Sequence, residues 1–148
     1  MNTHRLNDTI SIILAKQLRS AGLAWRPRWG DQFHIPDRNL DDRVFVIADL
    51  SVDLTTLADG IGAITFNGAV EWSLDYILTQ DVVWLPTETQ LRAKMGAAFR
   101  GLLTTDTGYR CDVESGSTVL GFEAKNATDA YAMALRHLLD PTVHDALG

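Results

Sequence analysis

Residues 64–72, with the sequence ITFNGAVEW, carry the clearest local structural signal in the chain. Asn67 and Gly68 both tolerate a positive φ, which a tight type I′ turn requires at its two central positions. Apolar and polar side chains alternate on either side of this pair, as expected where one face of a strand is buried. The segment therefore predicts a β-hairpin, and strands joined by hairpins favour an α+β fold with a mostly antiparallel sheet.

Outward from this hairpin, short apolar segments predict further strands. The expected strands span residues 32–35, 43–49, 51–57, 108–113 and 117–124. The 43–49 strand is apolar on both faces, which is typical of a central strand, whereas we expect the 51–57 strand at a sheet edge. The apolar segment 82–86 leads into a helix.

Amphipathic periodicity predicts the helices. They are expected near residues 7–21, 87–102 and 127–139. Asn7 or Asp8 can cap the first helix. Thr87 and Gln90 have the spacing of a capping box at the start of the second helix.

The composition is that of one globular domain, with 148 residues of which 46% are hydrophobic and 22% charged. We therefore predict a single α+β domain over residues 1–148, with a mainly antiparallel sheet, about three packed helices and a C-terminal tail at 141–148. The single cysteine excludes an internal disulfide and a cysteine-based zinc site. A single cysteine fits a reducing compartment, so we predict a cytoplasmic protein. No apolar run approaches the roughly 20 residues that cross a membrane, so we expect no membrane contact.

The net charge of −6 is unevenly distributed along the chain. Residues 1–30 carry five basic residues and one acidic residue, and residues 31–85 carry two basic and ten acidic residues. Because a nucleic-acid-binding protein normally presents a continuous basic surface, the acidic middle of the chain argues against nucleic acid as a partner. The contrast between the two segments instead predicts surfaces for recognising charged partners.

The segment GDQFHIPDRNLDDRVFVIADL, residues 30–50, raises the question of a metal or catalytic site. Its polar cluster consists of Asp31, His34, Asp37, Asp41 and Asp42. We expect His34 to point to solvent, because the apolar residues on either side of it would take the buried face. Asp37 follows Pro36 in a turn, where aspartate is favoured for local hydrogen bonds, and no second histidine has ligand spacing. We interpret the cluster as turns and caps and expect no catalytic residue, metal or cofactor; the alternative is a hydrolase that uses Asp31, His34 and Asp37.

The segment WRPRW, residues 25–29, is the stronger candidate for a binding site. Tryptophan on a loop is often a recognition anchor, although both tryptophans here could instead pack on the core. The loop follows the first helix and precedes the next strands, so it is held at both ends. We predict that the binding surface is formed by Trp25, Arg26, Arg28, Trp29, Asp31, His34, Asp37 and Arg38.

Other catalytic signals are scarce, since the chain lacks a nucleophile elbow, a phosphate loop and a dinucleotide fingerprint. We expect Cys111 in the core and His137 at the exposed end of the last helix. The sequence thus predicts a non-enzymatic binding or adaptor module that recognises a protein partner or a second copy of itself. The alternative is a protein that sequesters a small nucleotide signal, with arginines on the phosphates and a tryptophan stacked on the base.

Five segments occur in order between about residues 18 and 139: AGLAWRP, GDQFHIPDRNLDDRVFVIADL, ITFNGAVEWSLD, VVWLPTETQLR and DAYAMALRHLL. Together they resemble uncharacterised small proteins of actinobacteria and their phages that are often labelled as pilus-assembly proteins. The label implies an accessory role in pilus assembly. The ATPase that carries the same label needs a phosphate-binding loop, which this chain lacks, so the resemblance implies no ATPase activity.

Overall fold

The computed structural model describes residues 9–36, 43–47, 52–57, 60–66 and 76–141. The chain divides into two compact units, which we call the helical unit (Met1–Leu23 and Pro86–Gly148) and the tryptophan unit (Ala24–Leu85). Helices and antiparallel strands occur in separate runs, so the predicted α+β class is confirmed. The prediction of a single domain over the whole chain stays a prediction.

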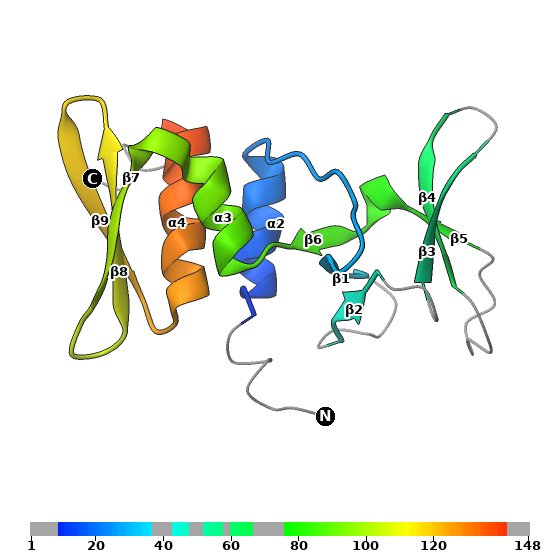
Figure 1. The fold of residues 1–148 in the computed structure, drawn as a ribbon, viewed down its shortest axis with the longest axis horizontal. Coiled ribbons are helices and arrows are strands. Elements are labelled where there is room, and N and C mark those ends of the chain that lie inside the picture. Colours follow the sequence, from blue (N-terminus) through cyan, green and yellow to red (C-terminus); the bar gives the residue numbers. More distant parts are fainter. Residues whose placement is uncertain (1–8, 37–42, 48–51, 58–59, 67–75, 142–148) are drawn as a thin grey trace. The chain divides into compact units, whose positions relative to one another are not determined.

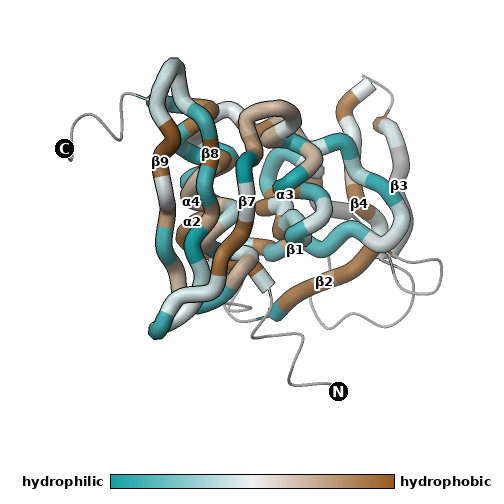
Figure 2. Tube along the Cα trace, turned by 60° about the vertical axis from the view of Figure 1, so that its left-hand side comes forward, coloured by the Kyte–Doolittle hydropathy of each residue, from teal (hydrophilic) through white to brown (hydrophobic). Residues whose placement is uncertain are grey.

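The helical unit combines helices with one antiparallel sheet, on which its last helix packs. The helices are α2 (Ile12–Ser20), α3 (Glu88–Met95) and α4 (Ala127–Leu139), and the strands are β7 (Phe99–Thr104), β8 (Tyr109–Ser115) and β9 (Thr118–Ala124), in the order β7-β8-β9. The helices lie on one side of this sheet (Figure 1). Polar and apolar residues alternate along β8 (Figure 2), and its Cys111 and Val113 are fully buried. The predicted core position of Cys111 and the predicted final helix at 127–139 are confirmed.

Capping side chains set where the helices begin. The first helix, predicted near residues 7–21, begins later than expected, because Ser11 caps α2 through its hydroxyl group and the helix starts at Ile12. The prediction that Asn7 or Asp8 caps this helix is therefore wrong. The capping box of Thr87 and Gln90 is confirmed, with each side chain accepting a hydrogen bond from the other residue's backbone N–H. No helix in the described part of the chain is long and apolar enough to cross a membrane.

The prediction of a helix over 87–102 is wrong in its second half. Helix α3 ends at Met95, because Gly96 takes a positive φ of 56° that breaks the helical path. A short 3-10 turn (Gly96–Ala98) follows, and then β7 pairs with β8. Phe99, which fits the helical stripe, instead begins this strand, and its ring packs on Tyr131 of α4.

The tryptophan unit is built from short strands. They are β1 (Gln32–His34), β2 (Phe45–Val46), β3 (Val52–Thr56), β4 (Gly62–Phe66), β5 (Tyr76–Leu78) and β6 (Val83–Leu85), arranged in the sheets β2-β1-β6 and β3-β4-β5. The strand predicted at 32–35 and the edge strand predicted at 51–57 are confirmed as β1 and β3. The tight hairpin predicted at residues 64–72 is wrong. A two-residue turn at Asn67–Gly68 would place Val70 opposite Thr65, but Tyr76 of β5 pairs there, and β3 pairs with the other edge of β4. The residues between β4 and β5 lie outside the described part of the chain.

The prediction of a central strand over 43–49 is wrong in the described part of that segment. Only Phe45–Val46 forms a strand there, and β2 lies at the edge of its sheet with β1 in the centre. The reason is that β1 contributes the fully buried Phe33, which is paired with Phe45 on one side and Trp84 on the other. Val46, by contrast, is exposed.

Candidate functional site

The segment Ala24–Asp31, which we call the tryptophan loop, leads into β1 of the tryptophan unit. Solvent exposure alternates along this loop. Trp25 and Pro27 are half-buried, whereas Arg26 and Arg28 are exposed. Trp29 follows with 55% of its surface exposed. The loop therefore directs two cations and one large aromatic ring outward.

A buried carboxylate holds this loop from behind. Asp31 is only 5% exposed, and its Oδ2 atom accepts hydrogen bonds from the indole N–H of Trp25 (3.0 Å) and from the backbone N–H of Arg28 (3.1 Å). The backbone N–H of Asp31 in turn donates to the carbonyl oxygen of Arg28 (3.1 Å). One aspartate thus holds both Trp25 and Arg28 of the WRPRW segment in place.

Backbone hydrogen bonds join the end of the loop to the strand segment beside it. Gly30 has a φ of 89°, which allows its N–H to donate to the carbonyl oxygen of Ile47 (2.8 Å). The N–H of Ile47 returns a hydrogen bond to the carbonyl oxygen of Asp31 (2.9 Å). The chain on either side of Trp29 is therefore fixed.

Aromatic rings support the loop from within the unit. Phe45, Phe33 and Trp84 are neighbours across the sheet, and the Phe33 and Phe45 ring centroids lie 5.6 Å apart. The Trp25 ring stacks on Trp84 (6.5 Å, 10°) and packs against Phe33 (6.0 Å). Trp25 thus has neighbours for its ring and an acceptor for its N–H, and its predicted contact with a partner stays a prediction.

The prediction that His34 points to solvent is wrong. The side chain is 3% exposed, and its Nδ1 atom lies 3.5 Å from the carbonyl oxygen of Arg43. Both faces of β1 are covered, so the alternation that places Phe33 inside does not place His34 outside. In the described segments no group of three or more histidine, cysteine, aspartate or glutamate side chains could hold a metal ion. Asp37, Arg38, Asp41 and Asp42 lie outside those segments.

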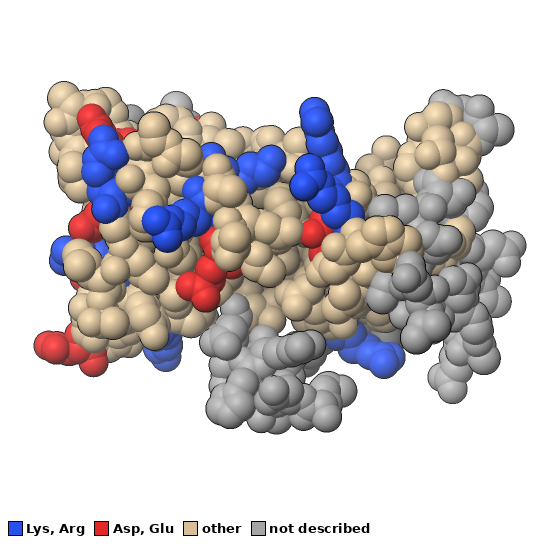
Figure 3. Space-filling view, viewed as in Figure 1, with Lys and Arg blue, Asp and Glu red and all other residues tan. Residues whose placement is uncertain are grey.

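The arginines of the tryptophan loop differ from several charged residues of the helical unit. In that unit Arg100 pairs with Glu114, and Arg110 pairs with Asp112 at 2.9 Å. Basic and acidic side chains are accordingly interspersed on the side of the helical unit seen in Figure 3. Among the described residues, neither arginine of the tryptophan loop forms an ion pair.

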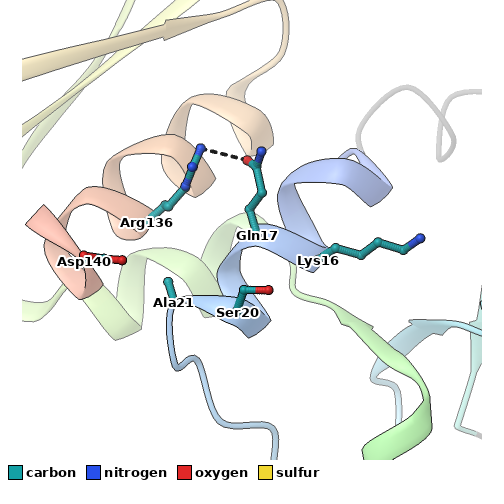
Figure 4. Close-up of a pocket in the computed structure, with 6 residues that line it drawn as sticks. All are labelled: Lys16, Gln17, Ser20, Ala21, Arg136 and Asp140. Atoms are coloured by element: carbon teal, nitrogen blue, oxygen red, sulfur yellow. Dashed lines mark hydrogen bonds between the residues drawn. The ribbon is translucent and has the colours of Figure 1, made fainter. Parts of the chain in front are cut away.

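The helical unit also contains a small hollow between the C-terminal ends of α2 and α4. It measures about 210 Å³ and is lined by Lys16, Gln17, Ser20, Ala21, Arg136 and Asp140 (Figure 4). Arg136 donates a hydrogen bond to the side-chain oxygen of Gln17 (2.9 Å), and Lys16 extends away from both. The hollow is below the usual size of a small-molecule site of about 300–1,000 Å³, and its charged groups do not converge.

The prediction that His137 lies exposed at the end of the last helix is also wrong. His137 is buried, with its Nε2 atom 3.0 Å from the Ser115 hydroxyl and its ring 5.5 Å from the Phe122 ring. The β8–β9 hairpin extends far enough to cover the last turn of α4, which helical periodicity cannot indicate.

Burial and the charge of Asp112 raise the pKa of the Cys111 thiol to about 11.

Comparison of the chain with protein-family models, with curated proteins and with solved structures gives no match. The geometry of the tryptophan loop must therefore carry the functional argument. Sequence reasoning selected this loop, placed Asp31 in its binding surface and interpreted the acidic cluster as turns and caps. It did not indicate the hydrogen bonds that Asp31 accepts from Trp25 and Arg28.

Proposed function

We propose that the protein is a non-enzymatic binding module whose tryptophan loop recognises an acidic segment of a protein partner. The observation that supports this proposal is the contrast within the loop. Asp31 and the aromatic rings hold the backbone in place, while Arg26, Arg28 and Trp29 are exposed. A loop that is ordered before binding loses little conformational entropy in the complex, which favours affinity.

The exposed side chains define the chemistry of the partner. Guanidinium groups bind carboxylates through paired hydrogen bonds, and exposed tryptophan and arginine are the residue types most enriched among interface anchors. Arg26 and Arg28 supply two such groups, and Trp29 supplies an apolar surface beside them. An acidic segment with an apolar side chain would satisfy all three residues.

The contacts of Trp25 restrict the alternative of a nucleotide ligand to stacking on Trp29. Stacking on a base needs a free aromatic face near a phosphate-binding group. The ring of Trp25 already packs on two other rings, and its N–H already donates to Asp31, so Trp29 is left as the available ring in this loop. The contacts of Asp31 and the burial of His34 likewise favour structural roles over hydrolysis for these two residues.

Selection of peptides from a random phage-displayed library on the immobilised protein tests the proposal. We expect enrichment of acidic peptides that contain an apolar residue. In fluorescence anisotropy titrations, the double substitution Arg28→Ala and Trp29→Ala should weaken such a peptide by about tenfold or more, as loss of interface anchors does.

A matched control removes one cation and one apolar side chain from the helical unit. Lys94 is exposed and Ile13 is 71% exposed, so Lys94→Ala with Ile13→Ala should leave peptide affinity unchanged. Peptides that bind wild type and the loop variant equally would place the binding surface elsewhere. If a nucleotide raises the melting temperature of the wild type but not of the loop variant, the ligand of this loop is a nucleotide and not a peptide.

A further inference from the structure

We infer that the tryptophan loop selects an extended acidic segment in which two carboxylates stand two residues apart. This inference rests on the proposed function and adds the spacing of the partner's charges. It follows from the alternating exposure between Ala24 and Arg28, which places Arg26 and Arg28 on the same, outward side of the loop.

Pro27 helps to maintain this arrangement. A proline ring fixes its own φ near −65° and biases the preceding residue towards extended backbone. Pro27 is half-buried between the two exposed arginines, which is the exposure pattern of an extended backbone. In extended chain, side chains two residues apart lie about 6.5–7 Å apart on one side.

The same geometry applies to the partner. Acidic residues at positions i and i+2 of an extended peptide point to one side with the spacing of the two arginines, so each guanidinium can meet one carboxylate. Adjacent acids point to opposite sides, and acids three residues apart are separated by about 10 Å and also point to opposite sides. Only the i, i+2 pattern satisfies both arginines in one extended conformation.

The apolar end of the site lies beyond Arg28. Trp29 is exposed there, and the hydrogen bond from Gly30 to Ile47 brings the end of the loop beside β2. Val46, the last residue of β2, is exposed as well. An apolar residue of the partner next to its acid pair would therefore find an aromatic and an aliphatic surface.

Three synthetic peptides of identical composition test the spacing. Each carries one leucine and two aspartates in a serine background, with the aspartates adjacent, two residues apart or three residues apart. Anisotropy titrations at low salt should give the tightest binding for the two-residue spacing, by at least about fivefold over the other two. Arg26→Ala should reduce this preference to less than about twofold, whereas Lys94→Ala should preserve it.

The outcomes separate this inference from the proposed function. Equal binding of the three peptides, lost for all of them in the Arg28→Ala and Trp29→Ala variant, would overturn the spacing and leave the acidic partner standing. Preference for another spacing would also overturn it. Failure of all three peptides, together with selection of peptides without acidic residues, would overturn the proposed function itself.

Discussion

The tryptophan unit and the helical unit achieve a buried core by different means. The helical unit uses regular elements, with capped helices on strands of six or seven residues. In the tryptophan unit the described strands have two to five residues, and rings together with a buried aspartate provide much of the cohesion around β1. Short strands leave more backbone in loops, and one of these loops carries the exposed arginines and tryptophan.

The two units can be followed by separate probes. All four tryptophans of the chain belong to the tryptophan unit, and the single cysteine belongs to the helical unit. Tryptophan fluorescence during urea unfolding therefore monitors the first, and reaction of the Cys111 thiol monitors the second. The predictions below use these probes to test the contrast between the units.

The largest effect is expected from Phe33→Ala. This ring is fully buried and touches both Trp25 and Phe45, so its removal should lower the free energy of unfolding by about 3–5 kcal/mol. Urea titration followed by tryptophan fluorescence measures the loss. The corresponding substitution in the helical unit is Leu135→Ala, which should accelerate labelling of Cys111. A loss below about 1 kcal/mol for Phe33→Ala would mean that the aromatic rings do not hold the tryptophan unit together.

Asp31→Ala should be nearly as severe. It leaves the Trp25 indole N–H and the Arg28 backbone N–H without their common acceptor, at a cost of about 2–4 kcal/mol. Asp31→Asn keeps a side-chain carbonyl oxygen and should lose less, in the same urea titration. Unchanged stability in Asp31→Ala would show that the carboxylate does not brace the loop.

The helical unit should lose stability in alkaline solution through Cys111. Because the folded-state pKa is raised from 9.0 to about 11, the unfolded chain releases the thiol proton first as the pH rises. The contribution of this group to the free energy of unfolding is therefore fully present below pH 9 and is lost between pH 9 and 11, by on the order of 3 kcal/mol. Urea titrations over this range, followed by far-UV circular dichroism because α2, α3 and α4 belong to this unit, should show a shallower decline for Cys111→Ala, and parallel declines would contradict the assignment.

A smaller effect distinguishes two stacked tryptophans. The Trp25 N–H donates to Asp31, whereas the buried Trp84 N–H has no hydrogen-bond partner in the described part of the chain. Trp25→Phe should therefore cost about 1 kcal/mol more than Trp84→Phe. Urea titrations of both variants measure the difference, using the remaining tryptophans as the fluorescent probe. Equal losses would indicate that ring packing alone fixes the loop.

Local patterns in the sequence predicted those elements whose boundaries depend on nearby residues. The box of Thr87 and Gln90 and the final helix are of this kind. The end of the helix at Met95 could not be predicted, because the residues around Gly96 fit a helical pattern. The strand that replaces the helix depends on the pairing of β7 with β8. His34 and His137 were placed on the surface since periodicity does not show which other segments cover them.

The candidate site, like the fold, could be predicted only in part from the sequence. Composition alone selected the WRPRW segment, and the exposure of Arg26, Arg28 and Trp29 agrees with that choice. The different orientation of Trp25 depends on Asp31 and on Trp84, which is 59 residues away in the chain. Contacts at that separation leave no periodic signal in a single sequence.

The most direct test of the central claim measures stability and peptide binding in one variant. With Arg28→Ala and Trp29→Ala combined, the free energy of unfolding should stay within about 0.5 kcal/mol of wild type, because both side chains are exposed. An anisotropy titration with a selected acidic peptide should show affinity reduced about tenfold or more in the same variant. A variant that unfolds as readily as Asp31→Ala, or that binds the peptide like wild type, would contradict the account of the tryptophan loop as a recognition surface.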